Sequence, residues 1–222
     1  ASGGNYNTVV GDEAGTAITT GDKNVFVGTL AGDATTTAGE NVAIGYDSLG
    51  TNILGSGSVA VGPSTLRTQN YGTATNAYNT AVGMFAGYAV TTGVQNTLIG
   101  AFAGDAITTA DESVAIGYLA LSANTTADDN TAIGSHALTA NTTGRINTAV
   151  GKGSMAANTT GQDNSAFGGL TLDANTTGTG NTALGYATLT SNTTADNNTA
   201  VGFNSGAAVT TGASNTFMGA SS

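Results

Sequence analysis

The sequence predicts an all-β fold, a parallel β-solenoid of about 13 coils with 17 residues in each coil. A five-residue phrase that ends in glycine recurs thirteen times along the 222 residues. The repeats are rich in Thr, Val, Ile, Asn and Gly, which favour strands and tight turns over helices. A 17-residue repeat is also too short for a helix pair or a propeller blade. Stacked β-coils fit all three observations.

The coils follow one another with almost no variation in length. They begin at residues 7, 24, 41, 58, 79, 96, 113, 130, 147, 164, 181, 198 and 215. Every step is 17 residues except that from 58 to 79, which is 21, so we expect an insertion loop at 67–78. The repeats fill nearly the whole chain, which predicts a single solenoid domain over residues 1–222.

Within each repeat, numbered 1–17 from its opening Asn or Ser, positions 3 and 4 are both apolar. Position 3 is Ala in nine coils, and position 4 is never polar. Successive residues of a strand point to opposite faces, so one of these columns fills the coil and something else covers the other. The sequence leaves open which column does which. The position 4 residues predicted to form the core or a trimer contact include Ile44, Ile99, Ile116, Ile133, Val150, Phe167, Leu184 and Val201.

Position 5 is glycine in all thirteen coils. Glycine at this point is expected if each coil turns with a positive φ or if the backbones of stacked coils approach closely. The predicted turn glycines include Gly45, Gly83, Gly117, Gly134, Gly151 and Gly185. Stacking also aligns the asparagines at position 1, which predicts an Asn ladder with hydrogen bonds from coil to coil.

Positions 9 and 12 vary together. Where position 9 is Gly, position 12 is Ile, Val or Thr, and where position 9 is Leu or Met, position 12 is Asn or Gln. All twelve complete repeats follow this rule. A conserved core volume would require such an exchange, which predicts two interchangeable ways of packing one coil.

Composition excludes several classes of function. The net charge of −10, from 14 acidic and 4 basic residues, argues against binding nucleic acid or anionic membranes. No apolar run approaches the roughly 18 residues that span a bilayer, so no membrane insertion of this segment is expected. His136 is the only histidine, and no nucleophile pairs with it by spacing. We therefore expect a protein that is not an enzyme and needs no cofactor.

Three weaker hypotheses come from the variable and polar positions. Acidic residues gather at positions 16 and 17, which could hold Ca²⁺, although most coils offer only one carboxylate there. Asn-x-Thr sequons recur at position 12, but their exchange with Val and Ile indicates packing rather than glycosylation. Paired threonines at positions 13 and 14 form ladders, which is the basis for an ice-binding alternative.

Two stretches carry a family resemblance. Residues 58–62 read S-V-A-V-G and residues 113–117 read S-V-A-I-G, followed by the small residues Thr65 and Ala120. They resemble the YadA-like head repeat of trimeric autotransporter adhesins, a left-handed parallel β-roll. The 17-residue form, as in 130–144, is similar to repeats of phage tail-fibre and virion structural proteins. The resemblance implies a left-handed homotrimer that works in attachment, and three extra residues per coil distinguish this chain from the shorter repeat.

The resulting functional hypothesis is a structural or adhesive segment of a trimeric extracellular, cell-surface or virion fibre. Its expected partners are two further copies of the chain and a host-surface receptor or glycan. A purely structural spacer is the other alternative beside ice binding. The predicted receptor contact is the insertion loop with Arg67, Tyr71 and Tyr78, since Arg and Tyr are enriched at binding hot spots and scarce elsewhere in this chain.

Overall fold

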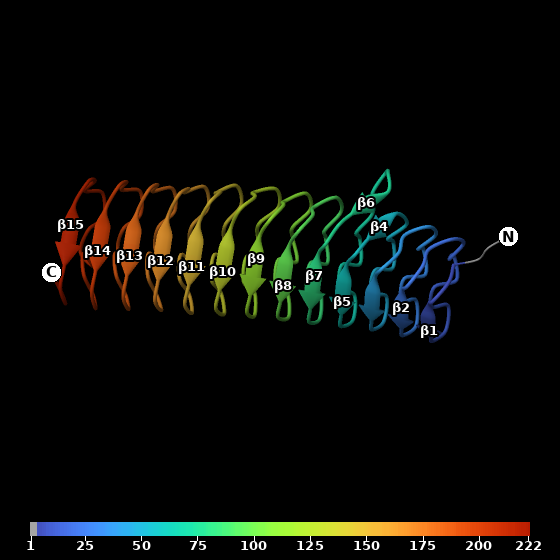
Figure 1. The fold of residues 1–222 in the computed structure, drawn as a ribbon. Coiled ribbons are helices and arrows are strands. Elements are labelled where there is room, and N and C mark those ends of the chain that lie inside the picture. Colours follow the sequence, from blue (N-terminus) through green and yellow to red (C-terminus); the bar gives the residue numbers. More distant parts are fainter. Residues whose placement is uncertain (1–3) are drawn as a thin grey trace. The chain divides into compact units, whose positions relative to one another are not determined.

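The computed structural model describes residues 4–222, and every regular element in that range is a β-strand. The described residues fall into two compact units, the first ending at Glu112 and the second running Ser113–Ser222. Each unit is a parallel β-solenoid, which confirms the all-β solenoid predicted from the repeats (Figure 1).

The first unit contains eight short strands, six of which follow the repeat. These six are β1 Thr8–Val10, β2 Val25–Val27, β3 Val42–Ile44, β5 Val59–Val61, β7 Thr80–Val82 and β8 Thr97–Ile99. The other two, β4 Gly55–Ser56 and β6 Thr75–Asn76, pair with each other as a separate two-stranded parallel sheet. They stand apart from the main row of strands in Figure 1.

The second unit contains seven strands, one in each repeat. They are β9 Val114–Ile116, β10 Thr131–Ile133, β11 Thr148–Val150, β12 Ser165–Phe167, β13 Thr182–Leu184, β14 Thr199–Val201 and β15 Thr216–Met218. Neighbouring strands pair in parallel with a shift of one repeat, so that Ala132 lies beside Ala149 and Ala149 beside Ala166. Every strand therefore occupies positions 2–4, and identical positions stack into columns.

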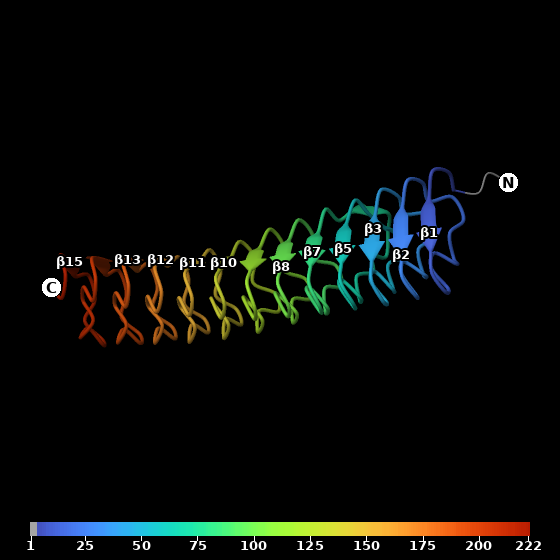
Figure 2. The same cartoon turned by 90° about the horizontal axis from the view of Figure 1, so that it is seen from below.

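Hydrogen bonds join neighbouring coils around the whole perimeter and not only at the strands. Between the coils that begin at 147 and 164, the bonds run from Thr148 N to Asn164 O (2.8 Å), Met155 N to Thr171 O (2.9 Å) and Thr159 N to Thr176 O (2.9 Å). Figure 2 shows the strands of each unit as one wall and the connecting loops as the others. The loops are thus as regular as the sheet, because many of their backbone N–H groups donate to a carbonyl one repeat away, while others, such as Asn158 N to Met155 O (3.1 Å), close turns within the coil.

The structure shows which of the two apolar columns, position 3 or position 4, fills the interior of each coil. The position 3 alanines, such as Ala132, Ala149 and Ala166, are completely buried. Position 4 points outward, with 42% of Phe167 and 50% of Leu184 exposed. Position 3 is therefore the core column, and the core alternative for position 4 was wrong because consecutive strand residues face opposite sides.

The position 5 glycines have the backbone conformation that the sequence predicts. The six turn glycines named above have φ between 130° and 139°. A Cβ on Gly134 would lie 2.5 Å from the carbonyl oxygen of Gly151 in the next coil. Both requirements, a positive φ and a close backbone approach, hold at the same position, which explains why no other residue occurs there.

Three further positions of each coil have a positive φ that the sequence does not predict. Positions 7, 9 and 17 take φ near 50–70° in coil after coil, whether the residue is Gly or not; examples are His136 (61°), Leu138 (50°) and Ile146 (57°). A non-glycine residue in this region costs roughly 1 kcal/mol. The hydrogen bonds that close each coil maintain this geometry.

The exchange between positions 9 and 12 has a structural basis that includes position 3. A Cβ on Gly104 would lie 2.8 Å from Leu98 Cδ2 and 2.8 Å from Ile107 Cδ1. In coils with Leu or Met at position 9, that side chain is itself fully buried, and position 3 is Ala. The prediction of two packing solutions is supported, and in the complete coils a large side chain at position 3, such as Phe26 or Leu98, occurs only where position 9 is Gly.

Buried asparagines form two ladders through the coils. At position 1, Asn147 Oδ1 accepts from the backbone N–H of Asn164 (3.1 Å), while Asn164 Nδ2 donates to Gly178 O (2.8 Å). At position 12, Asn158 Nδ2 donates to Asn141 Oδ1 (2.9 Å). The predicted ladder at position 1 is confirmed. The position 12 sequons are fully buried with their amides bonded, so packing accounts for them.

Candidate interaction surfaces

The first surface is the outer face of the main sheet, formed by position 4 in every coil. Ile44, Ile99, Ile133, Phe167 and Leu184 are exposed, and Ile116, Val150 and Val201 are half-buried. Within each unit these side chains stack at the ~4.8 Å spacing of adjacent strands. The result is a continuous apolar ladder on the solvent side of the sheet.

Aromatic and other large apolar side chains flank this ladder at position 6. They are Tyr46, Met84, Tyr118, Tyr186 and Phe203, and between 42% and 56% of each is exposed. The rings of Tyr186 and Phe203 stack with their centroids 5.8 Å apart, and the ring of Tyr118 meets that of His136 edge-on. Sequence reasoning missed this flank because position 6 also holds Asp, Gly and Lys. The only signal was the recurrence of large residues directly after the turn glycine.

The insertion loop was predicted to bring Arg67, Tyr71 and Tyr78 together, and the structure separates them. The guanidinium of Arg67 forms an ion pair with Asp47. It also lies over the ring of Tyr88, 5.9 Å from the centroid. Arg67 therefore belongs to a cluster on the coil body and not to the loop tip.

Tyr71 is buried, with 6% of its surface exposed. Its hydroxyl donates to Gly93 O (2.8 Å) and accepts from Asn79 Nδ2 (3.3 Å). Burial raises the pKa of the Tyr71 phenol well above its ordinary value, which keeps it a neutral donor. The expectation of a receptor contact was wrong for Tyr71, because its ring and hydroxyl complete the interior at the point where the repeat is interrupted.

Tyr78 is the one member of the predicted set that presents its ring to solvent, with 56% exposed. It occupies position 17, where φ is positive (51°). A Cβ on Gly57, at position 17 of the preceding coil, would lie 2.9 Å from Tyr78 Cδ1. The ring therefore folds back over Gly57, toward the coil that carries Glu40.

The insertion also builds a second short wall. Thr75 N donates to Leu54 O (3.2 Å), and Ala77 N donates to Ser56 O (2.9 Å), which fixes β6 against β4. The four extra residues are thus partly absorbed into a parallel strand pair. This wall could not be foreseen, since neither β4 nor β6 has an apolar alternation in the sequence.

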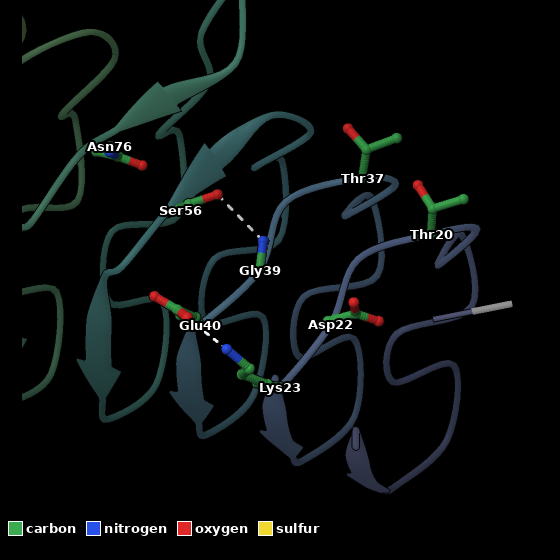
Figure 3. A pocket seen from close by; sticks show the side chains of 8 residues that line it. All are labelled: Thr20, Asp22, Lys23, Thr37, Gly39, Glu40, Ser56 and Asn76. Atoms are coloured by element: carbon green, nitrogen blue, oxygen red, sulfur yellow. Dashed lines mark hydrogen bonds and ion pairs between the residues drawn. The ribbon is translucent and has the colours of Figure 1, made fainter. Parts of the chain in front are cut away.

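Beside this wall lies a polar hollow of about 350 Å³ (Figure 3). Its lining comes from positions 14, 16 and 17 of the first coils and from β6, namely Thr20, Thr37, Asp22, Gly39, Ser56, Lys23, Glu40 and Asn76. Lys23 Nζ and Glu40 Oε1 form an exposed ion pair at 2.9 Å. Ser56 Oγ accepts from Gly39 N at 3.1 Å. The hollow offers hydroxyl, amide, carboxylate and ammonium groups within one depression.

Threonines form two distinct columns on the same side of the coils. At position 13 the hydroxyl donates to the carbonyl one coil on, as from Thr159 Oγ1 to Thr176 O (3.0 Å). At position 14 every threonine is exposed, from Thr20 and Thr37 in the first unit to Thr211 in the second. The position 14 threonines are exposed throughout, whereas the position 13 threonines are half-buried in most coils and exposed at Thr19, Thr125, Thr142 and Thr210.

Among the described residues, no group of three or more His, Cys, Asp or Glu side chains is arranged to hold a metal ion. Residues 4–222 also contain no helix long and apolar enough to cross a bilayer. Comparisons with protein-family models, curated proteins and solved structures found no match.

Proposed function

We propose that this chain is a structural and adhesive segment of a homotrimeric extracellular or virion fibre, without catalytic activity, built from left-handed coils. The observation that carries the proposal is the outward apolar ladder at position 4. Exposed apolar surface in contiguous patches marks sites of protein association. The resemblance of 58–62 and 113–117 to the head repeats of trimeric adhesins supports the same assembly and the role in attachment.

Periodicity argues that the ladder is covered by further copies of the same chain. Its side chains recur once per coil at the ~4.8 Å strand spacing, so a complementary surface must have the same period along its length. Another copy of the chain has the same coil spacing and therefore the same period. The aromatic flank at position 6 would close the edges of such an interface, because large amphipathic rings are enriched at association surfaces.

The test is the mass of the assembly in solution for the wild-type chain and two variants. Phe167→Asp together with Leu184→Asp places carboxylates in the ladder, and burying them unpaired in an interface is costly. Thr177→Asp together with Thr194→Asp adds the same charge at exposed position 14 sites. We expect the wild type and the position 14 variant to be trimers and the ladder variant to dissociate. A monomeric wild type, or a ladder variant that stays trimeric, would overturn the proposal.

Ice binding is a second candidate because ten of the twelve complete coils expose a threonine at position 14, six of them in an unbroken column from Thr126 to Thr211. Thermal hysteresis of the wild-type chain separates this function from a fibre segment. A measurable hysteresis that disappears in Thr160→Lys and Thr177→Lys would favour ice binding. A spacer without a ligand differs from an adhesive segment in showing no binding to host surfaces.

A further inference from the structure

We propose that the polar hollow beside β6 binds an uncharged saccharide, with Tyr78 as the stacking surface at its edge. The inference rests on the proposed role in attachment and names the chemical class of the ligand. It also moves the binding site away from the tip of the insertion loop. The hollow lies within the first unit, where the repeat is interrupted, and its volume of about 350 Å³ falls in the range of small-molecule sites.

The groups around the hollow are a mixture of hydrogen-bond donors and acceptors. The hydroxyls of Thr20 and Thr37 stand on one side, and the amide of Asn76 reaches in from β6 on another (Figure 3). Within residues 4–222 the carboxylate of Asp22 accepts a bond from Asn5 N at 2.5 Å, and a carboxylate can accept about four. Sugar hydroxyls both donate and accept, so they match this mixture better than a ligand with groups of only one kind.

The aromatic ring supplies the apolar contact that a sugar ring needs. The Cδ1–Cε1 edge of the Tyr78 ring lies over Gly57, and the absence of a side chain at Gly57 lets the ring reach back by one coil. Glu40, which lines the hollow, stands at position 17 of the coil before Gly57. The ring is therefore about one strand spacing, ~4.8 Å, from the coil of Glu40. The negative face of an aromatic ring attracts the weakly positive C–H groups of a pyranose.

The charges around the hollow argue against an anionic ligand. Lys23 is paired with Glu40, and Asp22 is the one further charged residue among the described residues that line the hollow, so these three residues leave one net negative charge. A sialylated or sulfated glycan would meet repulsion there, since like charges in a shared site disfavour each other. A neutral hexose or N-acetylhexosamine unit would not.

The experiment uses the full chain and saturation-transfer NMR with lactose, cellobiose, N,N′-diacetylchitobiose and 3′-sialyllactose as probes. The variants are Tyr78→Ala and Asn76→Ala, and the matched control is Tyr46→Ala, whose ring is exposed to the same extent, 56%, as that of Tyr78. Melting temperature is measured for each variant to show that it folds.

We expect at least one neutral disaccharide to bind the wild type and the sialylated probe to bind more weakly. Tyr78→Ala should weaken binding roughly tenfold and Asn76→Ala several-fold, while Tyr46→Ala leaves it unchanged. The proposal is overturned if no neutral probe binds, if the sialylated probe binds best, or if folded Tyr78→Ala binds as well as the wild type. The mass of the assembly is recorded on the same samples, so a monomer that binds sugar refutes the fibre alone, and a trimer that binds none refutes the site alone.

Discussion

Two pairs of coils have the same backbone conformation but different core side chains. One pair begins at 79 and 96 in the first unit, and the other begins at 130 and 147 in the second unit. At position 9, Gly87 and Gly104 have φ of 59° and 56°, and Leu138 and Met155 have 50° and 49°. In the first pair Leu98 fills the space above glycine, with Val90 and Ile107 beside it. In the second pair the position 9 side chain fills the space, and an Asn ladder takes position 12. The coil-to-coil hydrogen bonds therefore set the conformation, and side chains need only conserve the enclosed volume.

The largest loss of unfolding free energy is expected at the position 5 glycine, which both kinds of coil share. Gly83→Ala and Gly134→Ala each force a Cβ to within 2.7 Å and 2.5 Å of the backbone of the next coil, at φ of 130° and 134°. We expect both to lose at least about 3 kcal/mol of unfolding free energy, measured by chemical denaturation.

The matched control for this pair is Gly169→Ala, at position 6. The nearest atoms to its added Cβ would be 3.5 Å away, an ordinary contact. Its stability should change by less than about 0.5 kcal/mol. If Gly134→Ala were as mild as Gly169→Ala, close stacking of the position 5 backbones would not be a requirement of either coil type.

The next largest loss of stability is expected when the core packing of one coil type is introduced into the other. Gly104→Leu introduces the side chain of one coil type into the other, against Leu98 and Ile107, and overpacking should cost about 3 kcal/mol. Leu98→Ala alone opens a cavity at a fully buried site and should cost about 2–5 kcal/mol. Because the two side chains compete for one volume, the double variant should lose less than the sum. Additive losses in denaturation would show that positions 3 and 9 do not share that volume.

A smaller loss is expected on removing one rung of the position 12 ladder. Asn158→Ala leaves Asn141 Oδ1 and Gly161 O without the Asn158 amide, and Asn175 Nδ2 without its acceptor at 2.9 Å. The expected cost is about 1–2 kcal/mol in the denaturation midpoint assay. Thr160→Ala, on the exposed column two residues on, is the control and should be close to neutral. Equal stability of the two variants would mean that the ladder contributes nothing beyond space filling.

The smallest effect concerns the aspartates at position 10. Burial raises the pKa of Asp105 above its ordinary 3.8, and its Oδ1 is buried without a hydrogen-bond partner. In the second unit, Asp173 at the same position accepts from Thr190 Oγ1 at 2.5 Å. Because the folded state favours protonated Asp105, stability falls as pH rises from 3.8 through the folded pKa.

Asp105→Asn should therefore raise the melting temperature at neutral pH, and this gain should vanish below the ordinary pKa. Asp173→Asn should show no gain, because it weakens an existing hydrogen bond. A gain for Asp105→Asn that is independent of pH would contradict the assignment of the effect to the buried charge.

The sequence alone specifies the features that repeat with chemical identity. The coil boundaries, the strand that contains positions 3 and 4, the turn glycines such as Gly134 and the Asn ladder all follow from residues that recur every 17 positions. The exchange between positions 9 and 12 was also readable, because volume compensation leaves a covariation within one chain.

Features that depend on backbone closure could not be predicted. Position 17 holds residues as different as Lys23, Glu40, Tyr78 and Ile146. Because they have no residue type in common, the sequence does not reveal the positive φ that all of them share. The orientation of positions 3 and 4 was ambiguous because both are apolar, and only the closed coil puts Ala inside. The burial of Tyr71 and the pairing of β4 with β6 depend on an insertion that occurs once, and a single occurrence shows no pattern.

We propose that two further copies of the chain cover the outward ladder of Ile133, Phe167, Leu184 and their equivalents. Native mass spectrometry of the wild-type chain tests it most directly. A trimer should give a single dominant species of three times 21.5 kDa that persists on dilution. A dominant species at 21.5 kDa, with the chain folded by circular dichroism, would contradict it.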